Sequence, residues 1–464
     1  MPDFDVLVIG AGPGGYVAAI KAAQHGLKAA VVEKEALGGV CLNWGCIPTK
    51  ALLKSAEVLD TLRHAKDYGL ASGGEPTADF AAVMKRSRDV AEAMSKGVAF
   101  LMKKNKITVL SGTASFVSAD TVAIAKSDGT TSQVSAKHIV IATGHRVRSF
   151  PHLPVDGKRV LNYRQLLATT TKPKSLVAIG AGAIGMEFGY FLSTLGTQVT
   201  VVEVMDQVLP IEDTEIAQFV QRQFTKAGVA IHTSTKVTKL DVQADQVIVH
   251  IEANGQSSTI AAEQVLVAVG FLANTEGLGL DRAGVKLDER GFIAVDENLA
   301  TNIPGIWAIG DVAGKQLLAH KASHEAEACL AAITGHPQPV DYTQIPGCTY
   351  CQPQVASIGL TEKKAKERGR PYKIGKFQFV ASGKAKAIGH PEGFVKLVFD
   401  AEHMQLIGAH LTGYDATELL GELALAMKLE ATATELMTTV HAHPTLHEAV
   451  MEAAADALGE CVHQ

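Results

Sequence analysis

Two cysteines spaced five residues apart, Cys41 and Cys46 in the run Gly-Gly-Val-Cys-Leu-Asn-Trp-Gly-Cys-Ile-Pro-Thr-Lys, are the residues best suited to chemistry. On an ideal helix this spacing places the Cα atoms too far apart for a disulfide. The pair can close only if Cys41 lies in a distorted first turn, as the surrounding glycines permit. A disulfide between such near neighbours opens and re-forms readily, which suits redox catalysis. Since no further ligands cluster here, we predict no metal site.

A histidine cluster near the C-terminus supplies candidates for a base. His441, His443 and His447 precede Glu448 in the run His-Ala-His-Pro-Thr-Leu-His-Glu. Thiol exchange needs a base, because thiols are mostly protonated at neutral pH. Histidine titrates in the right range, and a carboxylate such as Glu448 can orient its ring. Spacing alone does not choose among the three histidines.

Two glycine-rich loops predict two dinucleotide sites, because each has the pattern G-x-G-x-x-G between an apolar strand and a helix. In such loops the first glycine makes the tight turn and the second admits the pyrophosphate. The third packs helix against strand, and the helix N-terminus faces the phosphates. The six glycines are Gly10, Gly12 and Gly15 in the first loop and Gly180, Gly182 and Gly185 in the second.

An acidic residue follows each loop at the same distance: Glu33 lies 23 residues after Gly10, and Glu203 lies 23 residues after Gly180. A carboxylate at this place accepts hydrogen bonds from a ribose 2′-hydroxyl and repels a 2′-phosphate. Glu203 therefore favours NAD over NADP, and no arginine follows it closely. The alternative is that both loops are glycine-rich turns that bind no nucleotide. The repeat of strand, loop, helix and acidic residue at one spacing argues against it.

The remaining pattern predicts an α/β fold, with two Rossmann-like dinucleotide-binding domains followed by a separate α+β domain. Beyond the two nucleotide-binding units we expect one long helix and a series of short strands. The helix is expected at about 79–104, the strands near 121–124, 138–142, 355–359, 394–399 and 406–411, and further helices from 416 onward.

Composition narrows the class further. The 464 residues are 47% hydrophobic and 20% charged, with a net charge of −5 and without basic clusters, so neither nucleic acid nor an anionic membrane is an expected partner. The apolar tract 176–196 contains Glu187 and several glycines, which indicates a strand, turn and helix rather than a membrane span. No signal-peptide pattern is seen, so we expect a cytoplasmic protein.

The cysteine run, the doubled nucleotide unit and the C-terminal histidine run together resemble the pyridine nucleotide-disulfide oxidoreductases along the whole chain. The resemblance is greatest to the branch that oxidises dihydrolipoamide and reduces NAD+ by way of FAD. It implies that Cys46 lies against the flavin as a thiolate and that Cys41 exchanges disulfides with the substrate. It also implies that His443 is the base, that Glu448 is its partner, and that both act from the other subunit of a homodimer.

The same resemblance assigns residues to the cofactors. Lys50 and Glu187 would form an ion pair beside the flavin, and Asp311 would bind its ribityl chain. Further FAD-lining positions are Ala114, Thr143, Gly144 and Ala319, and further NAD-side positions are Val237 and Gly270.

The resemblance also divides the chain and suggests partners. Residues 1–147 and 273–340 would form the FAD-binding domain, 148–272 the NAD-binding domain, and 341–464 the interface or dimerisation domain. The substrate would be carried by a lipoylated acyltransferase, or by the lipoyl protein of a glycine cleavage complex, because this chain has no lipoyl domain.

Alternatives within the family fit less well. A glutathione-type reductase would use NADPH, which Glu203 disfavours, and a mercuric reductase would carry a C-terminal cysteine pair where this chain has only Cys461. A soluble transhydrogenase would lack Cys41. A flavoprotein that only senses or docks would not need Cys41, Cys46, His443 and Glu448 together. Cys348 and Cys351 have redox or zinc spacing, but no second pair accompanies them, so we regard them as incidental.

Overall fold

The computed structural model describes residues 1–71 and 73–463. The chain divides into two compact units. Unit 1 comprises residues 1–51, 84–148 and 269–340, and unit 2 comprises residues 52–83, 149–268 and 341–464. Each unit is described by itself.

Unit 1 is built on a sheet with the strand order β3-β2-β1-β6, in which β17 also pairs with β6 and all these pairs are parallel. Val6, Leu7 and Val8 are fully buried, as expected for a parallel strand covered on both faces. Antiparallel β5 and β4 extend the sheet beyond β6. The strands are β1 (Phe4–Ile9), β2 (Ala29–Glu33), β3 (Thr108–Ser111), β4 (Thr113–Phe116), β5 (Thr121–Ala125), β6 (Thr131–Ile141) and β17 (Ile306–Ala308).

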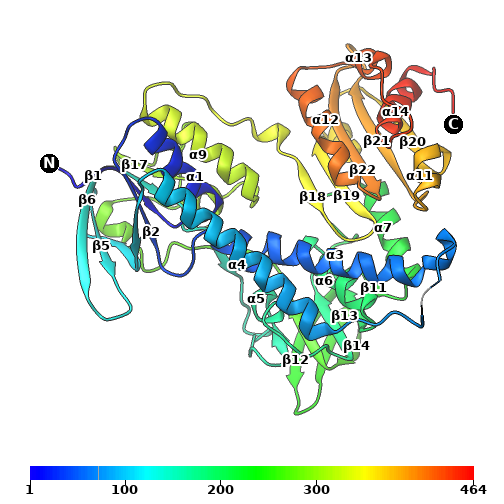
Figure 1. Cartoon of the computed structure of the whole chain (residues 1–464), viewed down its shortest axis with the longest axis horizontal. Helices are drawn as coiled ribbons and strands as arrows, with labels where there is room; N and C mark the ends of the chain where they lie inside the picture. The colour runs from blue at the N-terminus through cyan, green and yellow to red at the C-terminus, as the bar shows by residue number, and fades with distance from the viewer. Residues whose placement is uncertain (72, 464) are drawn as a thin grey trace. The chain divides into compact units, whose positions relative to one another are not determined.

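Helices α1 (Pro13–Gln24) and α9 (Ala319–Ile333) pack side by side in unit 1 (Figure 1). The buried residues of α1 are glycines and alanines only, so the two helices can approach closely. The other elements of unit 1 are α2 (Gly39–Trp44), the first turns of α3 (Cys46–Arg63), most of α4 (Phe80–Lys104), α8 (Leu280–Ala283), η2 (Gly310–Ala313) and the antiparallel pair β7 (His145–Val147) and β16 (Phe271–Ala273).

Unit 2 contains a second parallel sheet, with the order β11-β10-β9-β15-β8, and an antiparallel sheet β12-β13-β14. The strands are β8 (Val160–Leu161), β9 (Ser175–Ile179), β10 (Gln198–Val202), β11 (Ala230–His232), β12 (Thr235–Val242), β13 (Val247–Ala253), β14 (Gln256–Ala262) and β15 (Gln264–Val267). Its helices here are η1 (Ala65–Tyr68), α5 (Tyr163–Leu166), α6 (Ala183–Thr194) and α7 (Thr214–Lys226).

The C-terminal part of unit 2 is an antiparallel sheet with the order β18-β19-β22-β21-β20, against which α12 and α14 pack (Figure 1). Its strands are β18 (Gly347–Thr349), β19 (Gln354–Gly359), β20 (Tyr372–Gln378), β21 (Gly393–Asp400) and β22 (Leu406–Gly413). Its helices are η3 (Tyr342–Gln344), α10 (Glu362–Glu367), η4 (Phe379–Ala381), α11 (Gly383–Ala387), α12 (Ala416–Lys428), α13 (Ala433–Thr438) and α14 (Glu448–Leu458).

These elements confirm the predicted α/β architecture. The expected long helix is α4, and the five expected strands are β5, β6, β19, β21 and β22. The largest difference is β6, which begins at Thr131 rather than near 138, because its first half pairs with β5 and its second half with β1. Among the described residues, no helix is both long and apolar enough to cross a membrane.

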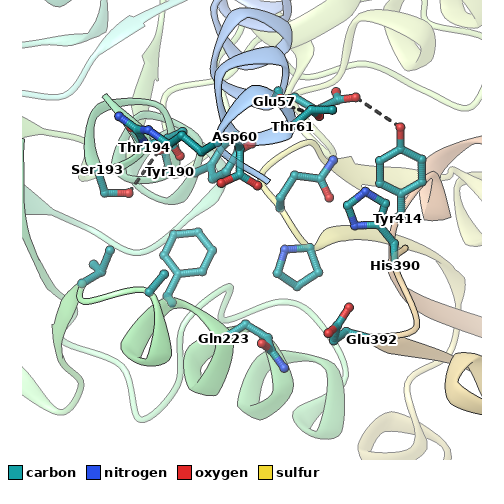
Figure 2. A pocket seen from close by; sticks show the side chains of 16 residues that line it. Glu57, Asp60, Thr61, Tyr190, Ser193, Thr194, Gln223, His390, Glu392 and Tyr414 are labelled. Atoms are coloured by element: carbon teal, nitrogen blue, oxygen red, sulfur yellow. Dashed lines mark hydrogen bonds between the residues drawn. The ribbon is translucent and has the colours of Figure 1, made fainter. Parts of the chain in front are cut away.

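Figure 2 shows a polar pocket of about 390 Å³ within unit 2, lined by residues of α3, α6, α7 and the C-terminal part. The rings of His390 and Tyr414 stack at one side, with centroids 4.2 Å apart, and the Tyr414 hydroxyl donates to Glu57 at 3.2 Å. Burial, with the charge of Glu57, raises the pKa of Tyr414 to about 12. None of the predicted catalytic residues lines this pocket.

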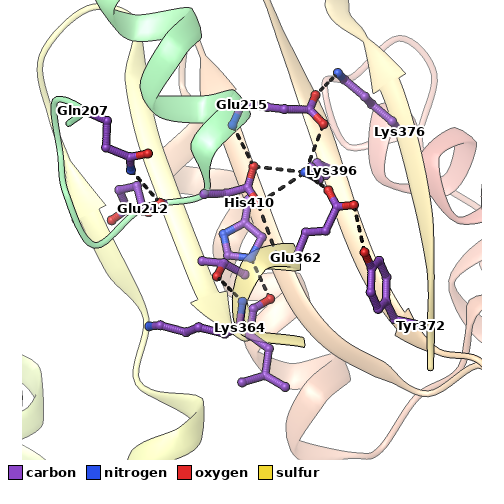
Figure 3. Close-up of polar contacts among 12 residues, drawn as sticks. Gln207, Glu212, Glu215, Glu362, Lys364, Tyr372, Lys376, Lys396 and His410 are labelled. Atoms are coloured by element: carbon purple, nitrogen blue, oxygen red, sulfur yellow. Dashed lines mark hydrogen bonds and ion pairs between the residues drawn. The ribbon is translucent and has the colours of Figure 1, made fainter. Parts of the chain in front are cut away.

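Lys396 on β21 is 1% exposed and joins α7 to the C-terminal sheet (Figure 3). Its Nζ donates to Asp213 and Glu215 at 3.1 Å each and to Glu362 at 2.6 Å. Burial opposes the charged lysine, but the hydrogen bond that it donates to Glu362 and the charge of Asp213 outweigh this effect and raise the pKa of Lys396. Removing one partner from such a buried network leaves an uncompensated charge, which destabilises the protein. We therefore assign the Lys396 network a structural role within unit 2.

Glu212 lies beside this network with its Oε2 atom buried and, within residues 1–71 and 73–463, without a hydrogen-bond partner. Burial raises the pKa of Glu212 to about 7 from 4.5. The folded protein therefore keeps a proton that the unfolded chain has released, so stability falls as the pH rises from 4.5 through about 7. The loss should total about 3 kcal/mol.

The substitution Glu212→Gln should remove this loss of stability. Thermal unfolding of the holoenzyme at about pH 5 and about pH 8 measures it, and the variant should gain stability over the wild type only at the higher pH. Glu367→Gln, at an exposed position of α10, is the matched control and should change neither value. An equal shift at both pH values would contradict a neutral, buried Glu212.

Candidate active site

Cys41 and Cys46 lie in two successive helices rather than in one. Cys41 lies in the six-residue helix α2, which ends at Trp44, and Cys46 begins the 18-residue helix α3. Gly45 between them has φ −137° and ψ −112°. A Cβ at Gly45 would lie 3.2 Å from the Val40 carbonyl oxygen, so the break is made at a crowded glycine. The helix break lets the two thiols meet, and Gly39 in the first turn of α2 has φ +59°, so Cys41 lies in a distorted first turn as the sequence predicted.

The two thiols interact directly. Hydrogen bonding with Cys46 raises the pKa of the Cys41 thiol, burial adds to this effect, and the charge of Lys50 opposes it. Lys50 follows Cys46 by one helical turn on α3. In the reduced pair, Cys41 is therefore the sulfur that releases its proton less readily than an ordinary thiol.

Residues that the sequence did not single out hold the α2 turn. Asn43 donates from Nδ2 to the carbonyl oxygens of Leu37 and Gly39, both at 3.0 Å. Arg88 on α4 donates to the Asn43 carbonyl oxygen at 2.5 Å, and its guanidinium lies 4.2 Å from the centre of the Trp44 ring. An arginine over an aromatic ring also gains cation–π stabilisation. In the sequence, these contacts of the α2 turn are indicated only by the presence of Asn43 and Trp44 between the two cysteines.

The first glycine loop has the geometry that a pyrophosphate site requires. Gly10 has φ +101°, and a Cβ there would lie 2.4 Å from the Ala142 carbonyl oxygen. At Gly15 a Cβ would lie 1.8 Å from the Gly10 carbonyl oxygen. A Cβ at Gly12 would meet no atom within 4 Å, and Gly12 caps α1 without a side-chain hydrogen bond. The helix N-terminus is therefore open toward a phosphate group.

The second loop repeats this geometry in unit 2. Gly180 has φ +102°, and Gly182 caps α6 without a side-chain hydrogen bond. A Cβ at Gly185 would lie 1.9 Å from the Gly180 carbonyl oxygen, whereas a Cβ at Gly182 would meet no atom within 4 Å. The three glycines therefore have different roles: Gly180 makes the turn, Gly182 leaves open space and Gly185 allows close packing. Substitutions can test these roles separately.

Gly182→Val should weaken NAD binding without unfolding the protein, since its side chain would occupy only the open space above α6. Crowding of this kind costs about 1–3 kcal/mol, or about 5- to 150-fold in the NAD dissociation constant. Gly185→Ala should instead lower the melting temperature, because its methyl group would collide with backbone. Titration with NAD and thermal unfolding measure the two effects, and a stable Gly185→Ala protein would contradict the close packing.

The acidic residue after each loop is tied back to that loop. The Glu33 carboxylate accepts hydrogen bonds from the Ala11 and Glu35 amides, both at 2.8 Å. The Glu203 carboxylate accepts from the Ala181 amide at 2.7 Å and the Met205 amide at 2.9 Å. Each carboxylate oxygen still has a lone pair for a ribose hydroxyl. Both residues therefore orient their loop as well as offering acceptors.

The predicted flavin-side residues other than Glu187 lie in unit 1. Asp311, in η2, accepts from His145 Nδ1 at 2.5 Å. Buried Lys321 donates from Nζ to the Gly310 carbonyl oxygen at 3.0 Å, and Glu325 accepts from the Gly310 amide at 2.6 Å. This α9 ion pair fixes the backbone immediately before Asp311, and the sequence analysis did not identify it.

Other predicted positions lie on the same framework. Thr143 donates from Oγ1 to the Asn274 carbonyl oxygen at 2.8 Å, and the Asn274 amide donates to the Gly144 carbonyl oxygen at 3.0 Å. Ala114 is buried in β4, and Ala319 begins α9. These small or backbone-bonded positions fit a lining role.

The remaining predicted residues lie as follows. Glu187 on α6 is 5% exposed and accepts from the Tyr350 amide at 2.9 Å. Val237 is buried in β12, where the register with β13 shifts. Gly270 has φ +97° and precedes β16. The ion pair between Lys50 and Glu187 stays a prediction.

The structure distinguishes the three C-terminal histidines. His443 Nδ1 lies 2.8 Å from Glu448 Oε1, and 79% of its side chain is exposed. Glu448 begins α14 and also accepts from the Thr445 amide at 2.9 Å. Burial opposes ionisation of Glu448, but the hydrogen bonds from Thr445 and His443 outweigh it and lower its pKa. His443 therefore has an ionised orienting partner and an accessible second nitrogen.

The other cysteines show no comparable arrangement. Cys351 is fully buried and its Sγ contacts the Pro353 carbonyl oxygen at 3.4 Å. Cys461 donates to Glu452 at 3.0 Å, and burial together with this carboxylate raises its pKa to about 11. No group of three or more histidine, cysteine, aspartate or glutamate side chains among residues 1–71 and 73–463 could hold a metal.

Comparison with curated proteins finds close relatives along the whole chain. A dihydrolipoyl dehydrogenase of Rhizobium etli is 48% identical and covers 99% of this chain and 99% of its own. Dihydrolipoyl dehydrogenases of Chlorobaculum tepidum and Mycobacterium tuberculosis are 49% and 45% identical, covering 98% and 100% of this chain and 97% and 100% of their own lengths.

Solved structures agree with the fold. LpdA of Mycobacterium tuberculosis matches with a TM-score of 0.90 at 26% identity, covering 97% of this chain and 99% of its own. The flavoprotein disulfide reductase RclA of Escherichia coli, solved as a Cu(II) complex, shares the fold with a TM-score of 0.88 at 24% identity, covering 98% of this chain and 99% of its own.

Family models account for most of the sequence. The model "Pyridine nucleotide-disulphide oxidoreductase" matches residues 4–326, and the model of that family's dimerisation domain matches residues 345–454. The chain belongs to the pyridine nucleotide-disulphide oxidoreductase family.

Proposed function

We propose that this chain oxidises protein-bound dihydrolipoamide and reduces NAD+ to NADH. The observation that carries the proposal is the contacting pair Cys41 and Cys46. The relatives along the full length are dihydrolipoyl dehydrogenases, which supports the choice of substrate. FAD and NAD are the cofactors of this branch of the family.

The two glycine loops provide places for these cofactors. The loop at Gly10–Gly15, with Glu33, Asp311 and the Thr143 turn, would hold FAD, and the loop at Gly180–Gly185, with Glu203, would hold NAD. The open Cβ direction at Gly12 and Gly182 fits both nucleotides. Bound FAD supplies two-electron transfer between a dithiol and a nicotinamide.

The protein's own groups account for the exchange of disulfides. His443 removes a proton from a substrate thiol, and the resulting thiolate attacks Cys41 Sγ of the Cys41–Cys46 disulfide. Cys46 leaves as a thiolate. The second substrate thiol then displaces Cys41 from the mixed disulfide, which yields lipoamide and reduced cysteines. Two electrons have then moved from substrate to enzyme, and their passage to NAD+ completes the balance.

The subunit arrangement is part of the proposal. The match of residues 345–454 to a dimerisation domain supports a homodimer, in which His443 and Glu448 act on the cysteine pair of the partner subunit. The lipoyl group would arrive on an acyltransferase or on a glycine-cleavage lipoyl protein in the cytoplasm. We also propose the corresponding division of the chain into domains. Residues 1–147 and 273–340 would form the FAD-binding domain, 148–272 the NAD-binding domain and 341–464 the interface domain.

Anaerobic assay of the FAD-loaded protein with dihydrolipoamide and NAD+ tests the function, with NADP+ as the comparison. Rapid NADH formation and poor use of NADP+ are expected, because the Glu203 carboxylate repels a 2′-phosphate. Reduction of glutathione disulfide by NADPH, with inert dihydrolipoamide, would contradict both the substrate and the role of Glu203.

A further inference from the structure

The loop that carries His443 has no regular structure of its own. It joins α13, which ends at Thr438, to α14, which begins at Glu448. The contact between His443 and Glu448 orients the ring but does not fix the preceding backbone. A base must be held within fractions of an ångström of its working position, so other contacts must hold this loop.

A single carboxylate on a neighbouring helix holds the loop on both sides of His443. Glu422, on α12, lies with Oε1 at 2.6 Å from His441 Nε2 and with Oε2 at 2.7 Å from His447 Nδ1. The two histidines stand two residues before and four residues after His443. The Glu422 side chain is 24% exposed, so both contacts are partly shielded from solvent.

Each ring nitrogen of His441 faces a hydrogen-bond acceptor. Its Nδ1 faces the Thr439 carbonyl oxygen at 2.9 Å and its Nε2 faces Glu422, while only 6% of its side chain is exposed. A carbonyl oxygen and a carboxylate can only accept hydrogen bonds. Acceptors therefore face both ring nitrogens of His441, which holds the ring in one orientation.

We propose that Glu422 is a positioning residue for the base. It anchors the loop to α12 through His441 and His447, while Glu448 orients the His443 ring from the start of α14. This inference rests on the proposed role of His443 in dithiol exchange. His441 and His447 both contact Glu422, so His443 is the histidine of this cluster that is available as a base.

Two reactions of the holoenzyme test the proposal. Glu422→Ala should lower the turnover number for dihydrolipoamide and NAD+ by about 10- to 100-fold, the cost of a displaced catalytic group. The rate at which NADH reduces an artificial acceptor by way of the flavin should not change, because that reaction bypasses His443. Glu422→Gln should have an intermediate effect, since an amide can accept only one of the two hydrogen bonds.

A mutant cycle makes the test specific. His441→Asn and His447→Asn should each lower dithiol turnover, but neither should lower it further in the Glu422→Ala background, because the shared partner is already gone. Glu418→Ala, at an exposed position of the same helix, is the control that should retain full activity. Additive losses would overturn a shared anchor.

The possible failures are distinguishable. If the wild type does not oxidise dihydrolipoamide, or if His443→Gln retains full activity, the proposed function fails. If both behave as expected but Glu422→Ala keeps wild-type turnover, only the positioning role is overturned. An equal loss in the dithiol and artificial-acceptor reactions would also overturn it, because that result indicates general damage to the structure.

Discussion

Replacing Cys46 by serine is expected to lower dihydrolipoamide-dependent NAD+ reduction by at least about 1,000-fold, since a covalent nucleophilic route is removed outright. Serine cannot form the disulfide that accepts electrons from the substrate. Cys41→Ser should have an effect of the same size, because the two sulfurs act as one redox unit and such units are strongly non-additive. Combining both substitutions should therefore add little.

The measurement is NADH formation with dihydrolipoamide, beside NADH oxidation by an artificial acceptor. The second reaction needs no disulfide and should survive in both variants. Cys461→Ser is the matched control, because a serine hydroxyl can still donate to Glu452. Dithiol turnover in Cys46→Ser within about tenfold of the wild type would remove the cysteine pair from the mechanism.

Replacing His443 by glutamine is expected to lower the same turnover by about 100- to 10,000-fold, the usual contribution of a general base. Glutamine is polar and of similar length but does not accept a proton at neutral pH. Glu448→Gln should have a smaller effect, because it leaves the base present and removes only its ionised partner, 2.8 Å away.

His403→Gln provides the control for this prediction, since the His403 side chain is 74% exposed and its Nε2 atom lies 3.7 Å from Glu402. It should retain wild-type activity. If His441→Gln rather than His443→Gln caused the greater loss, the base would have been assigned to the wrong histidine. Mixing inactive His443→Gln with inactive Cys46→Ser subunits should restore part of the activity if base and disulfide come from different subunits.

The nucleotide loops were the most predictable part of the fold, because their requirements are local. A Cβ at Gly15 would collide with the Gly10 carbonyl oxygen, and the same collision would occur between Gly185 and Gly180. Such close approaches demand glycine at fixed spacing, so they leave a clear trace in sequence. The acidic residues Glu33 and Glu203 are predictable for the same reason.

Contacts between segments that are distant in the sequence could not be predicted from it. Glu422 looks like one more acidic residue on an amphipathic helix, and its pairing with His441 and His447 emerges only when α12 packs beside the last loop. The Lys396 network likewise joins strand and helix residues far apart in sequence. The break between α2 and α3 at Gly45 was not predicted either, although the first turn of α2 is distorted at Gly39, with φ +59°, as the spacing of the two cysteines required.

The hydrogen bond from the Ala181 amide to Glu203 has a consequence for attempts to change the coenzyme preference of this enzyme. A designer would first exchange Glu203 for a neutral or basic residue to admit a 2′-phosphate. That exchange also releases the buried Ala181 amide and the partly buried Met205 amide, and an unpaired buried amide is costly. Redesign toward NADP therefore calls for at least two coupled substitutions, one to receive the phosphate and one to replace the lost acceptor.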